Sequence, residues 1–337
     1  MFLKILGFLG GIFSSIFQKA GETVGEEVGK KVTEIHPAPK TKRVFCIVVC
    51  VCVLLCGIGW FLYRGFHFKW SLNDGVLTLE AGFLTNGEMP DYHFVKPDFR
   101  MGNANHSAVM ISDFPWFYRR EEITRVILKD GITSISSGAF ADCVNLEEAY
   151  LPDSIIAIGD YAFHDCYTLT YITIPSSIAD IGKYAFNQCR GLIEVSCRYN
   201  GKSNSKGIIE YGAFWNCDSL QYMEIPYNMV KMGPFAFSYC SSLTEIYIPN
   251  GITKIETGTF QGCSNLKEIS IEGVREIGWG AFFDCFNLTK ITMPDSITHI
   301  HFSAFDGCAN LTSVSIPADA EIADDAFPEW TEVTRRG

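Results

Sequence analysis

A phenylalanine recurs at nearly constant spacing through most of the chain. Successive members are 22 or 23 residues apart, with one separation of 28, and in the first eight units a cysteine follows after three positions and a leucine after six. A unit this short cannot bury an apolar face on its own, so the next unit must cover that face. The spacing therefore predicts a repeat solenoid, whose function resides on the surface of the stack rather than in a pocket. The nine members are Phe140, Phe163, Phe186, Phe214, Phe237, Phe260, Phe282, Phe305 and Phe327.

The unit at 155–175 shows how each repeat is built. Its stretch Leu169-x-x-Ile172-x-Ile174 ends in period-two alternation, which is typical of a short strand with one buried face. The Gly-x-x-Ala-Phe segment between strands is too short for a regular helix, so we expect one helical turn or an irregular connection there. The expected fold is mainly β, with one short strand per unit of 22–23 residues. The apolar positions that should point inward are Ile155, Ile158, Phe163, Cys166, Leu169, Ile172 and Ile174.

These repeats resemble the BspA-like, or treponemal-type, leucine-rich repeat, whose units read close to Ile-Gly-x-x-Ala-Phe-x-x-Cys-x-x-Leu-x-x-Ile-x-Ile-Pro. The resemblance covers about residues 122–330. It implies a curved leucine-rich-repeat solenoid, often displayed on a cell surface for adhesion or recognition, without enzymatic activity or shared catalytic residues. The matching residues include Ile158-Gly159, Ala162-Phe163, Cys166, Leu169, Ile172, Ile174-Pro175, Ile181-Gly182, Ala185-Phe186, Cys189, Ala236-Phe237, Cys240, Ala304-Phe305 and Cys308.

Both ends of the repeat region are expected to be caps, because a stack leaves its terminal core open. Residues 66–121 resemble the N-terminal β cap of the family, and the Asn-Asp-Gly signal at 73–75 predicts a tight hairpin turn within it. Residues 122–337 hold the leucine-rich repeats. The last unit is degenerate, since residues 328–337 lack the repeat cysteine and leucine, and we expect a minimal C-terminal cap there.

A run of twenty residues without a charge, 44–63, is bracketed by Arg43 and Arg64. At about 1.5 Å per residue it would span roughly 30 Å, the thickness of a bilayer core, so it predicts a transmembrane helix. A buried core helix is the alternative. Trp60 and Tyr63 suit the interface at one end, and basic residues crowd the other end. The basic side is expected to stay inside, which makes the N-terminus cytoplasmic and the repeats extracellular, without a cleaved peptide.

Residues 1–35 are expected to form a cytoplasmic amphipathic and glycine-rich helical segment, joined to the membrane span by a linker at 36–43. Residues 1–20 place apolar side chains on one broad helical face, which suits a helix lying in a membrane interface. A helix-packing segment and a signal-peptide start remain alternatives. Residues 21–32 repeat Gly-x-x-Val, a weak helix former that should need a partner or a membrane.

The balance of charge also changes at the end of the apolar run 44–63. Residues 1–65 carry 8 basic and 4 acidic residues, and the remainder carries 19 basic and 34 acidic residues. An acidic repeat region argues against nucleic-acid binding and favours cationic or neutral ligands. The sequence contains no nucleophile elbow, phosphate loop or His-Glu-x-x-His motif, so we expect neither an enzyme nor a cofactor. His299 and His301 share a strand face but lack a third ligand, so we expect no metal site.

The cysteines of the repeats are expected to be buried free thiols, including Cys197 at a strand position that isoleucine holds in other units. The alternative is a disulfide ladder between adjacent turns, but strands stacked about 4.8 Å apart do not guarantee the required geometry. The four cysteines within 44–63 are expected to pack in the membrane, with acylation of Cys46 as the alternative.

Function is then expected on the outward side chains of the stacked strands, on the concave sheet that the resemblance implies. In the unit above, Tyr171 and Thr173 should point outward, and tyrosine and glutamate dominate the same positions of neighbouring units. Tyrosine is enriched at binding surfaces, although its high strand propensity offers an alternative explanation. The predicted ligand-binding residues are Glu148, Tyr150, Tyr171, Tyr222, Glu224, Glu245, Tyr247 and Glu268.

Together these features predict a membrane-anchored, non-catalytic recognition or adhesion protein that binds protein or glycan ligands through its strand face. Expected partners are such a ligand at the cell surface, the membrane through 44–63 and also through 1–20, and a second copy through the N-terminal helices. The expected location is the cell membrane, in a single pass. The alternative is a transmembrane signalling or assembly component whose N-terminal helices oligomerise or bind a cytoplasmic partner.

Overall fold

The structure is a computed structural model that describes residues 68–82, 87–89, 114–199 and 206–337. Several predicted features lie outside these residues and stay predictions: the helical segment at 1–35, the linker at 36–43 and the transmembrane helix at 44–63. Parts of the expected N-terminal cap, at 83–86 and 90–113, and residues 200–205 of the 28-residue unit also lie outside them. Among the described residues, no helix is both long and apolar enough to cross a bilayer.

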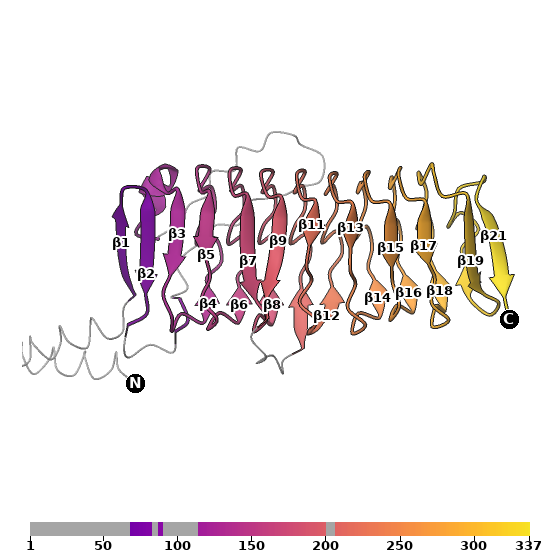
Figure 1. Cartoon of the computed structure of the whole chain (residues 1–337), viewed down its shortest axis with the longest axis horizontal. Coiled ribbons are helices and arrows are strands. Elements are labelled where there is room, and N and C mark those ends of the chain that lie inside the picture. The colour runs from indigo at the N-terminus through magenta and orange to yellow at the C-terminus, as the bar shows by residue number, and fades with distance from the viewer. Residues whose placement is uncertain (1–67, 83–86, 90–113, 200–205) are drawn as a thin grey trace, which may run out of the picture. The chain divides into compact units, whose positions relative to one another are not determined.

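Each repeat contributes one strand to a parallel ladder (Figure 1). These strands have two to five residues and are called the long strands below, because several reach five residues. The register advances by one unit per strand, so that Tyr171 pairs with Glu194 and Tyr222 pairs with Glu245. This part of the predicted fold is confirmed. The strands are β3 (Arg125–Leu128), β5 (Glu148–Tyr150), β7 (Tyr171–Pro175), β9 (Glu194–Arg198), β11 (Tyr222–Met223), β13 (Glu245–Ile246), β15 (Glu268–Ser270), β17 (Lys290–Thr292), β19 (Ser313–Pro317) and β21 (Glu332–Arg336).

A second ladder of short parallel strands runs along the stack, so the prediction of one strand per unit is wrong (Figure 1). These strands are only two to four residues long, too short to show period-two alternation, and they form because similar units stack in register. They are β4 (Ser134–Ile135), β6 (Ala157–Ile158), β8 (Asp180–Ile181), β10 (Gly207–Ile209), β12 (Met229–Met232), β14 (Lys254–Ile255), β16 (Glu276–Ile277), β18 (His299–Ile300) and β20 (Glu321–Ile322).

The connections around each repeat phenylalanine are irregular turns, which selects one of the two expected alternatives. The residues two before and two after each of the first eight phenylalanines have positive φ, as Tyr161 (φ 59) and Asp165 (φ 59) do around Phe163. Left-handed residues at both sides interrupt any helical turn between them. In the described part of the chain, the single helix is the 3-10 helix η1 (Phe117–Glu122), which precedes the first repeat.

The interior of the stack is a ladder of phenylalanine rings. The first eight repeat phenylalanines are fully buried, and from Phe163 onward neighbouring rings lie nearly parallel, with centroids 5.1 Å apart for Phe163 and Phe186 and 5.0 Å apart for Phe186 and Phe214. The other predicted inward positions of the unit at 155–175 are buried as well. Each ring covers the next, which explains why a single unit cannot exclude water from its core.

The repeat cysteines fill the space beside these rings. Cys166 Sγ donates to the Phe140 carbonyl oxygen of the preceding unit at 3.2 Å, and every later repeat cysteine makes the equivalent bond at 3.1 or 3.2 Å. All eight are buried and free, whereas Cys197 is free but only half-buried. The expectation of a buried residue is therefore wrong for Cys197, which lies at the wall of a surface groove.

The N-terminal end carries the predicted hairpin. Strands β1 (Lys69–Asn73) and β2 (Val76–Glu80) pair antiparallel around Asp74 and Gly75, whose φ angles of 47° and 79° suit a two-residue hairpin turn. Strand β2 then pairs in parallel with β3. The Trp116 ring stacks on Phe140 at 6.1 Å, and its Nε1 donates to the Ala139 carbonyl at 2.8 Å. An aromatic ring thus closes the first end of the ladder.

The C-terminal end is more complete than expected. Phe327 stacks on Phe305 with centroids 4.9 Å apart, and β21 adds a full five-residue strand beside β19. This strand was not predicted because residues 328–337 lack the repeat cysteine and leucine that mark the other units. An arginine of β21 also bonds this strand to the turn after β19, since Arg335 Nη1 donates to the carbonyls of Ala318 and Ala320 at 2.7 and 3.0 Å.

Candidate ligand-binding groove

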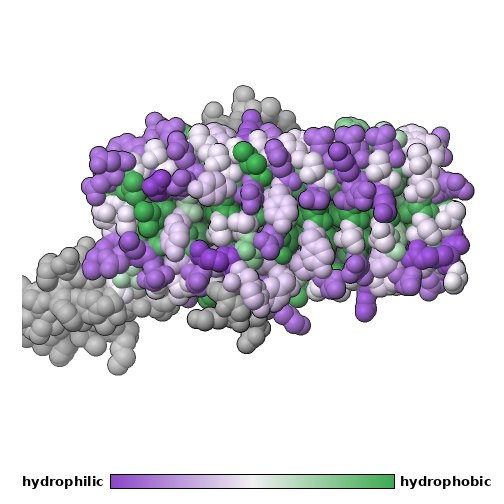
Figure 2. All heavy atoms as spheres, viewed as in Figure 1, coloured by the Kyte–Doolittle hydropathy of each residue, from purple (hydrophilic) through white to green (hydrophobic). Residues whose placement is uncertain are grey.

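The outward side chains of the long strands form two parallel rows. All four predicted tyrosines point outward, with exposed fractions of 53% for Tyr150, 52% for Tyr171, 43% for Tyr222 and 62% for Tyr247. One row, fixed by the strand register, is Glu148, Tyr171, Glu194, Tyr222, Glu245, Glu268 and Lys290. The other row is Tyr150, Thr173, Ser196, Glu224, Tyr247, Ser270 and Thr292. Figure 2 shows this face, where polar side chains alternate with small apolar areas.

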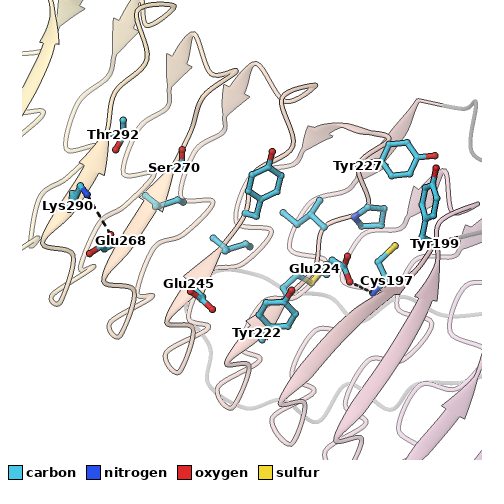
Figure 3. Close-up of a pocket in the computed structure, with 16 residues that line it drawn as sticks. Cys197, Tyr199, Tyr222, Glu224, Tyr227, Glu245, Glu268, Ser270, Lys290 and Thr292 are labelled. Carbon is cyan, nitrogen blue, oxygen red and sulfur yellow. Dashed lines mark hydrogen bonds and ion pairs between the residues drawn. The ribbon is translucent and has the colours of Figure 1, made fainter. Parts of the chain in front are cut away.

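A groove of about 650 Å³ crosses the rows at β11, β13 and β15 (Figure 3). Its floor is apolar, with Met223, Ile225, Ile246 and Ile269 almost fully buried beneath it. The predicted binding residues that line it are Tyr222, Glu224, Glu245, Tyr247 and Glu268. The structure therefore brings five of the eight predicted residues together.

The groove opens where the ladder narrows. Strands β11 and β13 have two residues each, after the five residues of β9. At this step the Cys197 N–H donates to the carboxylate Oε2 of Glu224 at 3.0 Å. A side chain thus replaces the backbone ladder at the groove wall, which leaves room above the floor.

The remaining predicted residues lie outside the groove. The Glu148 carboxylate pairs with Arg125 Nε at 2.7 Å, and the Arg198 guanidinium lies 5.7 Å from the centre of the Tyr150 ring. Tyr171 aligns with Glu148 and not with Tyr150, so the first tyrosines do not form one row. A binding role for these three residues stays a prediction.

Two further tyrosines line the groove and were not predicted. Tyr199 and Tyr227 lie with ring centroids 5.6 Å apart at its upper wall (Figure 3). Tyr199 begins the extra segment of the 28-residue unit, and Tyr227 follows the proline that ends a strand sequence, a position that holds Ser176 or Asn250 in other units. Only the unequal spacing of that unit hinted that this surface differs from the rest.

The charges of the groove are mainly negative. Register places Glu245 next to Glu268, whose Oε2 lies 3.9 Å from Lys290 Nζ. In the described part of the chain, the Glu245 carboxylate makes no ion pair or hydrogen bond. Burial, followed by the nearby Glu224, raises the pKa of the Cys197 thiol to about 11, so this thiol is protonated at neutral pH. The groove offers binding groups rather than an activated nucleophile.

His299 and His301 lie elsewhere, at the short ladder. Their rings are 6.4 Å apart, but His299 Nε2 faces Glu321 at 3.2 Å and His301 Nε2 faces Glu276 at 2.8 Å. Over the residues that the structure describes, no group of three or more histidine, cysteine, aspartate or glutamate side chains is arranged to hold a metal ion.

The two parallel ladders, the internal phenylalanine stack and the outward strand side chains define a leucine-rich-repeat solenoid of about nine turns. The chain belongs to the BspA-type leucine-rich repeat family, since the model of the BspA type leucine rich repeat region, with 6 copies, matches residues 114–208 and 207–334. The resemblance noted in the sequence is confirmed. No curated protein matches the chain.

Several solved bacterial structures are similar. A leucine rich cell surface protein from Faecalibacterium prausnitzii is 23% identical, with 78% of this chain and 84% of that chain covered and a TM-score of 0.37. The T. pallidum leucine rich repeat protein is 23% identical, with 66% and 87% covered and a TM-score of 0.38. The pneumococcal vaccine antigen PcpA is 18% identical, with 80% and 86% covered and a TM-score of 0.39. These likenesses concern the fold alone.

Proposed function

We propose that the chain is a non-catalytic recognition protein that binds a protein or glycan ligand in the groove at β11, β13 and β15. The observation that carries this proposal is the gathering of Tyr199, Tyr222, Tyr227 and Tyr247 around one apolar floor. Tyrosine combines a large contact area with a polar hydroxyl and few rotatable bonds, which suits a binding surface. The phenylalanine ladder fills the interior of the stack, so a ligand has to bind at its surface.

We further propose that the repeats are displayed outside the cell, anchored by the apolar run at 44–63. The charge-free length of this run and the basic residues before it support that orientation. Protease added to intact cells that express the chain should digest the repeats and spare residues 1–40. A repeat region that stays protected until the cells are opened would contradict the orientation while leaving the groove proposal intact.

The groove proposal can be tested on the full-length protein in lipid nanodiscs, with a glycan array and a random dodecamer peptide library as probes. Ser270 lines the groove, and Ser315 stands in the corresponding position of β19 outside it. Ser270→Trp places a bulky ring in the groove and should weaken binding of the selected probes at least about tenfold, while the matched control Ser315→Trp should bind normally.

Two results would contradict the proposal. One is probe binding that survives Ser270→Trp, because the ligand would then contact another surface. The other is the absence of specific binding from both panels. Circular dichroism of each variant shows whether the fold is retained.

A further inference from the structure

We propose that the groove takes an extended peptide segment carrying a lysine or arginine, whose cationic group lies beside Glu245. This inference rests on the proposed recognition function and names the chemistry of its ligand. Glu245 lies on β13, the central strand of the groove, with Tyr222 beside it in register on β11 (Figure 3). Tyr247 follows two residues later, just past the end of β13 and on the same face. A cation at this point would contact one carboxylate and two aromatic rings.

The first support is an unfavourable charge arrangement in the free protein. Glu245 and Glu268 occupy adjacent strands in register, and like charges directly opposite each other destabilise a sheet. Lys290 Nζ lies 3.9 Å from Glu268 Oε2, on the side of Glu268 that faces away from Glu245. Glu245 has no cationic partner among the described residues. A ligand cation placed at Glu245 would supply the missing partner.

The second support is the balance of charge over the whole groove. Its lining contains three carboxylates, Glu224, Glu245 and Glu268, against the single ammonium group of Lys290. Such a surface repels anionic ligands and attracts cations from a distance. A neutral glycan could stack on the tyrosines, but it would leave the repulsion between Glu245 and Glu268 in place.

The aromatic side chains favour the same ligand. An ammonium or guanidinium group within about 6 Å of an aromatic face gains a cation–π interaction, and guanidinium groups also stack flat on such rings. Tyr222, in register with Glu245 on β11, and Tyr247, two residues further along the chain, are exposed aromatic residues next to the one whose carboxylate would neutralise the charge. Carboxylate and ring together bind a basic side chain more strongly than either alone.

The dimensions of the groove suit an extended peptide rather than an isolated small cation. It reaches from Cys197 on β9 to Thr292 on β17, which is four strand spacings. At about 4.8 Å per spacing this is roughly 20 Å, the length of about six residues of extended chain. Tyr199 and Tyr227 at one end provide contacts beyond the charged centre.

The test selects dodecamer peptides on the full-length protein and removes those that also bind Ser270→Trp. The surviving peptides should be enriched in lysine or arginine, and replacing these residues by norleucine or citrulline should weaken binding at least about tenfold. Binding should also weaken as salt is raised from 50 to 500 mM, because partly exposed charges are screened.

The protein side of the test uses Glu245→Gln, with Glu194→Gln as control in the same row outside the groove. Glu245→Gln should weaken binding of the selected peptide about tenfold, because it removes the carboxylate that pairs with the ligand cation. It should also raise the midpoint of thermal unfolding, because it removes a like charge beside Glu268. Glu194 adjoins Tyr171 and Tyr222 rather than a carboxylate, so its variant should change neither quantity.

Each failure has a distinct meaning. The selected ligands could instead be peptides without basic residues, or glycans alone, whose binding is lost in Ser270→Trp. That result would overturn the inference of a cationic peptide and preserve the proposed function. Unchanged peptide affinity in Glu245→Gln would likewise overturn this inference. Ligands that bind Ser270→Trp as tightly as the wild-type protein would overturn the proposed function itself.

Discussion

Arg198 and Arg336 stand at equivalent ends of two long strands, and each reaches back two repeats to a backbone carbonyl. Arg198 Nη2 donates to the Leu151 carbonyl at 2.7 Å, and Arg336 Nη2 donates to the Met293 carbonyl at 2.6 Å. In the ladder, the donor for the Leu151 carbonyl would come from Pro175, which has no N–H group. The arginine supplies the hydrogen bond that proline removes, in the two places where the regular repeat stops.

This relationship predicts local loosening when Arg198 is replaced. Arg198→Gln should raise hydrogen exchange of the β9 amides about tenfold, since losing hydrogen bonds from a charged donor costs about 1–2 kcal/mol. Arg125→Gln is the control, because its ion pair with Glu148 lies at the surface and such pairs contribute little. Equal exchange in wild type and Arg198→Gln would show that the bond to Leu151 adds no stability.

The phenylalanine ladder predicts a large effect from a single central ring. Phe237 is fully buried, with neighbouring rings at 5.3 and 5.6 Å. Phe237→Ala should lower the free energy of unfolding by about 3–5 kcal/mol, or melt the adjoining repeats first. Denaturant unfolding measures the effect. Phe302→Ala, at a ring that is 61% exposed, should leave the curve nearly unchanged, and similar losses in both variants would contradict the ladder as the main core.

A half-buried acid, Asp165, predicts a pH dependence with a definite sign. Burial, and next the nearby Asp142, raises the pKa of Asp165 from 3.8 to about 6. The folded protein therefore holds this proton more tightly, so the stabilisation is complete below the unfolded pKa and is lost as pH rises toward 6. Asp165→Asn removes the charge and tolerates the left-handed backbone at this position.

At pH 7.5, Asp165→Asn should raise the free energy of unfolding by roughly 1–2 kcal/mol, less than the full shift because the carboxylate is partly exposed. The advantage should disappear below about pH 4, where the wild-type acid is protonated in both states. Urea unfolding across this pH range makes the comparison. A variant that is less stable than wild type at pH 7.5 would show that the ionised carboxylate is favourable.

The thiols predict a simple labelling pattern. Burial raises the pKa of repeat thiols such as Cys166, whereas Cys197 is half-buried at the groove wall. Brief alkylation of the native protein should therefore modify Cys197 before any of the eight repeat cysteines. Denatured but unreduced protein should be labelled at all nine, as mass spectrometry can show. A loss of two hydrogens per neighbouring pair would instead establish a disulfide ladder.

The core was readable from the sequence because each of its positions repeats. The spacing of Phe163, Cys166 and Leu169 names the buried residues directly, and the Asn-Asp-Gly signal at 73–75 gives the hairpin. The short ladder was missed because a strand such as Ala157–Ile158 is too brief to alternate. Its pairing comes from the neighbouring units.

The groove was only partly readable for a related reason. Tyr222 and Tyr247 stand at outward strand positions, whereas Tyr199 lies in the extra segment of the 28-residue unit and Tyr227 follows the strand of the next unit. The two become neighbours only in three dimensions. The strand register itself was readable, because the 23-residue spacing already places Tyr171 in line with Glu148, as the structure has it.

The most direct measurement compares two pairs of tyrosines on the same sheet face. The selected dodecamer peptide is titrated by isothermal calorimetry against Tyr222→Ala/Tyr247→Ala, inside the groove, and against Tyr150→Ala/Tyr171→Ala, outside it. The groove pair should lose more than about 2 kcal/mol of binding free energy with unfolding almost unchanged, because neither ring belongs to the core, while the outer pair should bind as wild type does. Equal losses from both pairs, or full binding by the groove pair, would contradict recognition in this groove.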